Sequence, residues 1–129
     1  MIKLEKELNK MDIQYFGTSS HIISPEAFFQ KENIVLLDVR TKQEIENVKL
    51  TLTNFCKVLE IPVNEISYRN NEIPKDKFIG IFCSGGIRAA MIFTYLLGKG
   101  YRNIKILDGG YNPMMDALKP GKVLKKINK

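Results

Sequence analysis

Hydrophobic residues along the chain form short blocks that are separated by polar segments. The apolar runs 33–40 (NIVLLDVR) and 78–83 (FIGIFC) are short and rich in branched residues, which is typical of strands buried on both faces. The segment 103–111 (NIKILDGGY) predicts a further strand, and 57–62 (KVLEIP) favours a strand that Pro62 closes. We therefore expect a sheet assembled from these segments.

Helix-start signals lie between the predicted strands. Ser24 is placed as an N-cap and Pro25 as the first helical residue, so a short helix is expected within 24–31. Thr41 and Glu44 have the spacing of a capping box, which predicts a helix immediately after the run 33–40.

The carboxyl-terminal half contains the longest helical pattern. Apolar positions in 86–100 recur at helical spacing, and Gly100 is placed as a C-cap. We also expect a short helix in 63–70, a surface loop in 70–77 and a last short helix from Pro113 to about Leu118, which Pro120 and Gly121 end. The region 49–66 has the least readable pattern.

Strands that alternate with helices predict crossover units, and hence an α/β fold with a mostly parallel central sheet flanked by helices on both faces. The length of 129 residues, 44% of them hydrophobic, favours one domain over 1–129, with a core of about 22–118 and a basic tail at 119–129. In such sheets the functional crevice lies beyond the carboxyl ends of the strands. Asp38, Cys83 and Asp108 each fall at such an end.

Composition restricts the setting in which the protein works. No apolar run reaches the roughly 18 residues that a membrane span needs, and the amino end alternates charged with apolar residues, unlike a secretory signal. We therefore expect a cytoplasmic protein whose two cysteines, Cys56 and Cys83, are free thiols. Because His21 is the single histidine of the sequence, a structural zinc cluster of histidine and cysteine is not expected.

The formal net charge of +6 arises largely from lysines near the two ends of the chain. No aromatic residues interleave these lysines as stacking platforms for bases would, so solvated ends are favoured over a nucleic-acid interface. The positive balance is compatible with a small anionic substrate.

A cysteine followed by two glycines and an arginine is the strongest candidate for chemistry. Ser84, Gly85 and Gly86 predict a tight turn whose backbone N–H groups surround the sulfur of Cys83, and a helix beginning near Ile87 adds the positive end of its dipole. Arg88 adds a full charge at the rim. We expect these groups to hold Cys83 as a thiolate without the help of a histidine.

The other two candidate side chains are given structural interpretations. His21 lies far from Cys83 in the sequence and is interpreted as a surface residue at the start of a strand, although sequence distance leaves a catalytic role open. Cys56 is interpreted as a core thiol, with a resolving or redox-sensing partner of Cys83 as the alternative.

The loop Cys83–Arg88 (CSGGIR) resembles the active-site loop of the rhodanese-like sulfurtransferases. Three further segments resemble that family in the expected order: 36–45 (LLDVRTKQEI), 61–66 (IPVNEI) and 100–114 (GYRNIKILDGGYNPM). The resemblance covers most of 22–118. It departs from the family pattern in the stretch leading to Pro62, where NVKLTLTNFCKVLEIP replaces the usual Gly-His-Ile-Pro-Gly-Ala-like segment.

This resemblance implies a three-layer rhodanese-like fold and a transfer of sulfane sulfur through a persulfide of Cys83, with Arg88 as the second catalytic residue. It implies that Ser84, Gly85, Gly86, Ile87 and Arg88 bind the substrate. Asp38 and Arg40 are interpreted separately as a strand-end ion pair that supports the loop, because burying one member alone would be costly. No cofactor is needed. The expected partners are a small anionic donor such as thiosulfate and a thiol, cyanide or protein acceptor, with no nucleic acid or membrane, for a monomer or homodimer.

Two alternatives to sulfur transfer remain open at this point. Cysteine-dependent phosphatases and arsenate reductases also hold a thiolate in a loop, but the phosphatases place one more residue between cysteine and arginine than Ser84 to Ile87 provide, and a phosphoryl group needs the wider ring of amides. The second alternative is a non-enzymatic persulfide carrier or redox-sensing interaction module.

Overall fold

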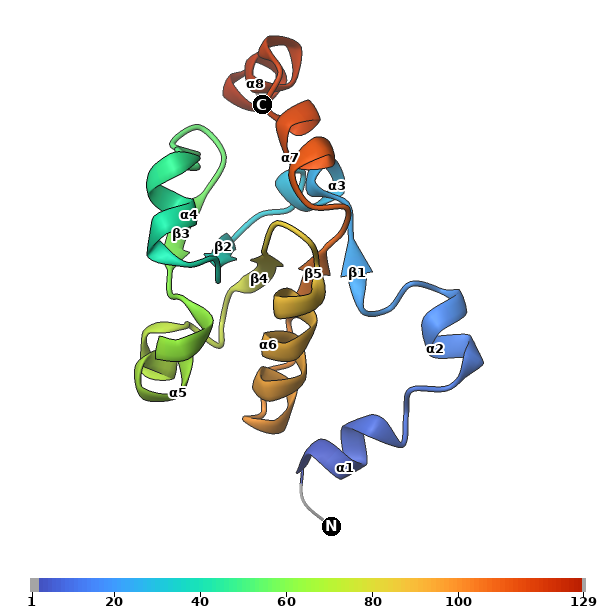
Figure 1. The fold of residues 1–129 in the computed structure, drawn as a ribbon. Coiled ribbons are helices and arrows are strands. Elements are labelled where there is room, and N and C mark those ends of the chain that lie inside the picture. The colour runs from blue at the N-terminus through green and yellow to red at the C-terminus, as the bar shows by residue number, and fades with distance from the viewer. Residues whose placement is uncertain (1–2, 129) are drawn as a thin grey trace.

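A computed structural model describes residues 3–128 of the chain. These residues contain a parallel five-stranded sheet in the order β1-β5-β4-β2-β3 (Figure 1). The predicted α/β class with a parallel central sheet is confirmed. The strands are β1 (Ile22–Ile23), β2 (Ile34–Asp38), β3 (Lys57–Glu60), β4 (Phe78–Phe82) and β5 (Ile104–Leu107).

Helices connect the strands and cover the sheet. Within 3–128 they are α1 (Lys3–Leu8), α2 (Ile13–Gly17), α3 (Pro25–Phe29), α4 (Lys42–Asn47), α5 (Ile66–Arg69), α6 (Ile87–Gly98), α7 (Tyr111–Ala117) and α8 (Pro120–Ile127), with 3-10 turns η1 (Val63–Glu65) and η2 (Asn70–Glu72). None of the helices in this part of the chain has the length and apolar character that crossing a membrane requires.

Side chains of the central strands alternate between two hydrophobic clusters. In β2, Val35 and Leu37 belong to the cluster that contains the buried residues of α6, whereas Leu36 belongs to the cluster that contains those of α3 and α7. Successive strand residues point to opposite faces, so the sheet is buried on both sides. Figure 1 shows α3 and α7 packed side by side, and the two helices are in contact.

Two predicted helix starts have the expected caps. The Ser24 hydroxyl accepts from the N–H of Ala27 at 3.2 Å at the start of α3. Thr41 and Glu44 form the reciprocal capping box of α4. Both sequence predictions are confirmed. They could be made from the sequence because each cap depends on neighbouring residues alone.

The final helices differ from the prediction. Helix α7 begins at Tyr111, before the predicted Pro113, which lies within the first turn where its missing N–H has no helical partner to lose. Pro120 does not end a helix but begins α8, in the position where proline is favoured. The segment predicted as a solvated tail is therefore largely helical, and Lys126 Nζ donates to the carbonyl of Phe29 at 2.6 Å.

The amino-terminal segment, whose lysines were predicted to be solvated and are exposed, forms a helix that the sequence analysis did not predict. Helix α1 packs against α6, and Glu7 forms an ion pair with Arg102.

The strand register aligns the carboxyl ends of β2 and β4. Asp38 lies opposite Phe82, and the N–H of Val39 donates to the carbonyl of Phe82 at 3.0 Å. The segments that follow β2 and β4 consequently lie side by side.

Candidate active site

The loop from Cys83 to Arg88 joins the end of β4 to the start of α6. Gly86 has φ +89°, a left-handed conformation that glycine adopts without the steric cost of a Cβ. Cys83 is buried, with 1% of its surface exposed, while Gly85 and Ile87 are exposed. The sequence placed this cysteine at the carboxyl end of a buried strand, and the structure does the same.

Two backbone N–H groups point at the sulfur of Cys83. The Sγ atom accepts from Gly86 N at 2.9 Å and from Ala89 N at 3.3 Å. Gly86 has no side chain with which to cap α6, so the sulfur occupies the position of a capping acceptor for the first turn of the helix. The sequence predicted donors from the turn, and the structure adds Ala89, which lies inside the helix.

Arg88 is held by a carboxylate from another helix. Its Nη1 and Nη2 donate to the two carboxylate oxygens of Glu44 at 2.6 and 2.9 Å, and Nη2 also donates to the Ser84 hydroxyl at 2.9 Å. Both charged side chains are 31% exposed. The hydrogen bonds from Arg88 hold the pKa of Glu44 well below its usual range, and the hydrogen bond to Glu44 raises the pKa of Arg88.

Glu44 is a site residue that the sequence reasoning did not find. It was assigned to the capping box, and its Oε1 does accept from the N–H of Thr41 at 3.1 Å. The same carboxylate also binds Arg88. Glu44 lies in 36–45, one of the segments that resemble the family, but a capping role already accounted for the residue.

Asp38 and Arg40 form a second carboxylate–arginine pair, which is fully buried. Arg40 Nε donates to Asp38 Oδ1 at 2.9 Å, and Nη2 donates to Oδ2 at 2.6 Å. Arg40 Nη1 reaches the Val48 carbonyl at 2.8 Å and the Tyr111 hydroxyl at 3.1 Å. Burial disfavours the charge of Arg40, but the hydrogen bonds to Asp38 and Tyr111 outweigh burial and raise its pKa.

The turn before α7 packs directly on the cysteine loop. Gly110 has φ +68°, and a Cβ at this position would overlap the carbonyl oxygen of Ser84. The next residue, Tyr111, contacts both Arg40 and the ring of Phe82, whose centroid lies 5.7 Å from its own. The Gly-Gly turn within 100–114 thus shapes the site because its backbone lies directly against the cysteine loop. No pattern in the sequence predicted this contact.

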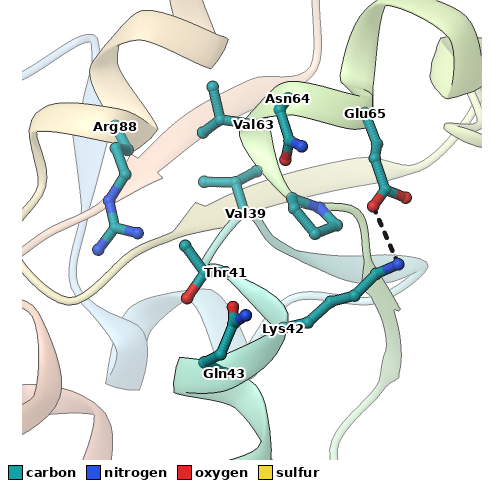
Figure 2. A pocket seen from close by; sticks show the side chains of 9 residues that line it. Val39, Thr41, Lys42, Gln43, Val63, Asn64, Glu65 and Arg88 are labelled. Carbon is teal, nitrogen blue, oxygen red and sulfur yellow. Dashed lines mark ion pairs between the residues drawn. The ribbon is translucent and has the colours of Figure 1, made fainter.

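A cavity of about 510 Å³ lies beside the loop. Figure 2 shows Arg88 on one side of it and Asn64 and Glu65 on the other, with Thr41, Lys42 and Gln43 below. Lys42 Nζ and Glu65 form an ion pair at 3.2 Å across its edge. Arg88 is the residue of the loop that lines this cavity, and Cys83 itself is buried.

The remaining candidates lie elsewhere. The His21 ring packs on Tyr15 and Phe16 of α2, with its Nδ1 buried and without a hydrogen-bond partner. Cys56 is a free, partly buried thiol that packs against the α3 and α7 cluster, and burial raises its pKa to about 11. Among residues 3–128 no group of three or more histidine, cysteine or acidic side chains is arranged to hold a metal ion.

The loop geometry can be compared with known protein families. The family model described as Rhodanese-like domain matches residues 26–117, which is most of the chain. The chain belongs to the rhodanese-like domain family. The matched range contains both carboxylate–arginine pairs and the whole loop from Cys83 to Arg88.

Relatives of this rhodanese-like domain carry names from sulfur and tRNA chemistry. A sulfurtransferase of Allochromatium vinosum is 34% identical over 79 residues, which cover 61% of this chain and 69% of the relative. A tRNA uridine(34) hydroxylase of Legionella pneumophila is 30% identical over 135 residues, covering 95% of this chain but 51% of the relative. The chain therefore spans about half the length of that hydroxylase.

Solved structures show the same fold. The NAD-dependent persulfide reductase from A. fulgidus superposes with a TM-score of 0.59 at 34% identity, over 78% of this chain and 17% of that one. A rhodanese-related protein from Thermoplasma volcanium gives a TM-score of 0.60 at 21% identity over 78% of this chain and 95% of its own, which bears on the fold alone. The family and these names support rhodanese-type sulfur-transfer chemistry.

Proposed function

We propose that this rhodanese-like domain is a sulfurtransferase that carries sulfane sulfur as a persulfide of Cys83. The observation that supports this most directly is the pair of N–H groups, from Gly86 and Ala89, aimed at Sγ at the start of the twelve-residue helix α6. A helix amino terminus and backbone donors favour negative charge at that position. Cys83 then reacts as a thiolate without a histidine base, since His21 packs against α2.

In the loading step, the thiolate of Cys83 attacks the outer sulfur of a donor. With thiosulfate, a new S–S bond forms to Sγ, the S–S bond of thiosulfate breaks, and its electron pair leaves with sulfite. Two negative charges enter with the donor and one with the thiolate, and the products, Cys83 persulfide and sulfite, carry the same three. No oxidant, metal or cofactor takes part in this step.

In the unloading step, an acceptor such as a thiolate or cyanide attacks the outer sulfur of the persulfide. The S–S bond of the persulfide breaks, its electron pair returns to Sγ, and the acceptor leaves as a new persulfide or as thiocyanate. Because the transfer is split into two displacements, donor and acceptor bind to the site one after the other. Residues 84–88 bind the persulfide, and the cavity lined by Arg88 and Asn64 provides the approach to the loop.

The roles of the two arginines differ in this proposal. Arg88, whose charge is paired with Glu44, lies beside the loop, while Arg40 and Asp38 support the loop through Tyr111 and the ring of Phe82. Arg88 Nη2 also fixes the Ser84 hydroxyl, which orders the first residue after the nucleophile.

Intact-mass spectrometry tests the proposal. We expect wild-type protein incubated with thiosulfate or with methanethiosulfonate to gain the mass of one sulfur atom, and to lose it when cyanide is added with release of thiocyanate. The Cys83→Ser variant should gain nothing, and the matched Cys56→Ser variant should behave as wild type. A gain that survives Cys83→Ser, or no gain with either donor, would contradict sulfur transfer.

The same preparations separate the alternatives. Release of a chromogenic phenol from a phosphate ester by wild type, but not by Cys83→Ser, would instead favour a phosphatase. Loading of Cys83 without turnover of any thiol or cyanide acceptor would favour a persulfide carrier that serves one particular protein.

A further inference from the structure

In the part of the chain that the structure describes, each cationic side chain that lines the cavity beside the loop forms an ion pair with a carboxylate. Arg88 is paired through both terminal nitrogens with Glu44, and Lys42 is paired with Glu65. The other lining residues are uncharged: Val39, Thr41, Gln43, Pro62, Val63 and Asn64. A donor that approaches the loop through this cavity therefore meets no unpaired positive charge.

Glu44 occupies the part of Arg88 that an oxyanion would use. A guanidinium binds sulfonate or carboxylate oxygens through two parallel N–H donors, and here both Nη atoms already bind the two oxygens of one carboxylate, at 2.6 and 2.9 Å. Nη2 is further engaged by the Ser84 hydroxyl. Glu44 is itself fixed by the capping box with Thr41, so it is not free to swing away without weakening the start of α4.

We propose that Glu44 is a specificity-determining residue that holds Arg88 and thereby makes the site favour singly charged sulfane-sulfur donors over dianionic thiosulfate. This inference rests on the proposed sulfurtransferase function and names its donor class: a monoanionic persulfide or thiosulfonate. Glu44 acts through Arg88, so it is a positioning residue and does not take part in the transfer itself.

Thiosulfate and methanethiosulfonate form a matched pair of probes. Both present an outer sulfur bonded to an oxidised sulfur. Attack by the Cys83 thiolate forms the same persulfide in both cases and releases sulfite from thiosulfate or methanesulfinate from methanethiosulfonate. The two donors differ by one negative charge, so the ratio of their kcat/KM values reports how the site treats that charge.

The variant Glu44→Gln removes the carboxylate charge and keeps a side-chain oxygen that can accept from Thr41, because a capping box works with glutamine as well as glutamate. We expect the ratio of kcat/KM for thiosulfate to that for methanethiosulfonate to rise about 3- to 10-fold in this variant. The control is Glu46→Gln, which removes one charge from an exposed position on the same helix. In this control the ratio should stay at the wild-type value.

Two further measurements distinguish a charge effect through Arg88 from a structural effect. Raising the salt to about 1 M, where the screening length is about 3 Å, should shrink the difference between Glu44→Gln and wild type. In the Arg88→Gln background, Glu44→Gln should raise the ratio less than it does in wild type, because the guanidinium that Glu44 holds is missing and only direct repulsion by the carboxylate is removed. A ratio that rises equally in that background would overturn the inference, because Glu44 would then repel the donor directly.

Failure of this inference and failure of the proposed function give different results. If Cys83 gains sulfur from both donors but Glu44→Gln leaves their ratio unchanged, the sulfurtransferase proposal stands and the role of Glu44 is refuted. If neither donor loads Cys83, the sulfurtransferase proposal itself is refuted.

Discussion

Two carboxylate–arginine pairs lie at the carboxyl edge of the sheet, and they have different surroundings. Asp38 and Arg40 come from the end of one strand and are fully buried, whereas Glu44 and Arg88 come from the starts of two helices and are each 31% exposed. Both pairs are bidentate. The same chemical contact therefore occurs in a dry and in a partly wet environment within one molecule.

This difference in burial predicts different roles for the two pairs: the buried pair supports the fold, and the partly exposed pair helps to select the substrate. Removing one member of a buried pair leaves an uncompensated charge in a medium that cannot solvate it, whereas water can solvate the remaining member of a partly exposed pair. We expect Asp38–Arg40 to contribute mainly to the stability of the fold around the loop. In our proposal Glu44–Arg88 contributes little to stability and mainly determines the charge that a donor meets.

The largest expected loss in the free energy of unfolding comes from breaking the buried pair. Arg40→Met leaves Asp38 buried without a counter-charge and removes the donor to the Val48 carbonyl and the Tyr111 hydroxyl. We expect the free energy of unfolding in urea to fall by about 3–5 kcal/mol. This is a large part of the stability of a typical domain.

Two other variants keep this prediction testable if Arg40→Met does not fold. Arg40→Lys retains the charge but not the planar fork, so it should lose less stability than Arg40→Met. Lys49→Met breaks the exposed pair with Glu60 and should change stability little. A loss below about 1 kcal/mol in Arg40→Met would mean that the buried pair behaves like an exposed one.

A smaller effect is expected at the contact that joins the buried pair to the turn beside the loop. Tyr111→Phe removes the hydroxyl that accepts from Arg40 and leaves the ring on Phe82 in place. We expect a loss of about 1.5 kcal/mol in the free energy of unfolding, the lower end for a hydrogen bond to a charged group. Tyr68→Phe, at a 70% exposed tyrosine, is the control and should show no measurable change.

The partly exposed pair should be less important for stability. Arg88→Gln is expected to lower the free energy of unfolding by less than about 1 kcal/mol, while it changes the rate at which Cys83 takes sulfur from thiosulfate. Parallel urea titrations and loading assays check this separation. If Arg88→Gln destabilises the fold as much as Arg40→Met does, the contrast between the two pairs is wrong.

The smallest expected effect is the dependence of folding stability on pH through Glu44. Because the pKa of Glu44 is lower in the folded state than its usual value, its pairing stabilises the fold above about pH 4.3 and this contribution is lost as the pH falls toward the folded-state pKa. Wild type should exceed Glu44→Gln in stability by less than about 1 kcal/mol at pH 7, and the gap should close in acid. A gap that stays constant from pH 7 to acid would point to packing and not to charge.

Local signals in the sequence predicted the elements that carry the loop. The capping residues Ser24 and Thr41 and the runs around β2 and β4 depend on neighbouring residues, so they could be read directly. Helix α8 was missed because Pro120 was interpreted as a terminator although proline also starts helices. Helix α1 was missed because its short, highly charged sequence is stabilised by packing on α6.

The sequence by itself determined the alternation of strands and helices, the position of Cys83 at the end of a buried strand, and the resemblance that placed the chain in its family. These follow from residue spacing, which is local. Only the tertiary structure decided that Glu44 binds Arg88, that Tyr111 binds Arg40, and that Gly110 lies against Ser84. Each of these contacts joins residues at least 26 positions apart in the sequence, and only the parallel sheet, by bringing its carboxyl ends to one edge, places them within reach.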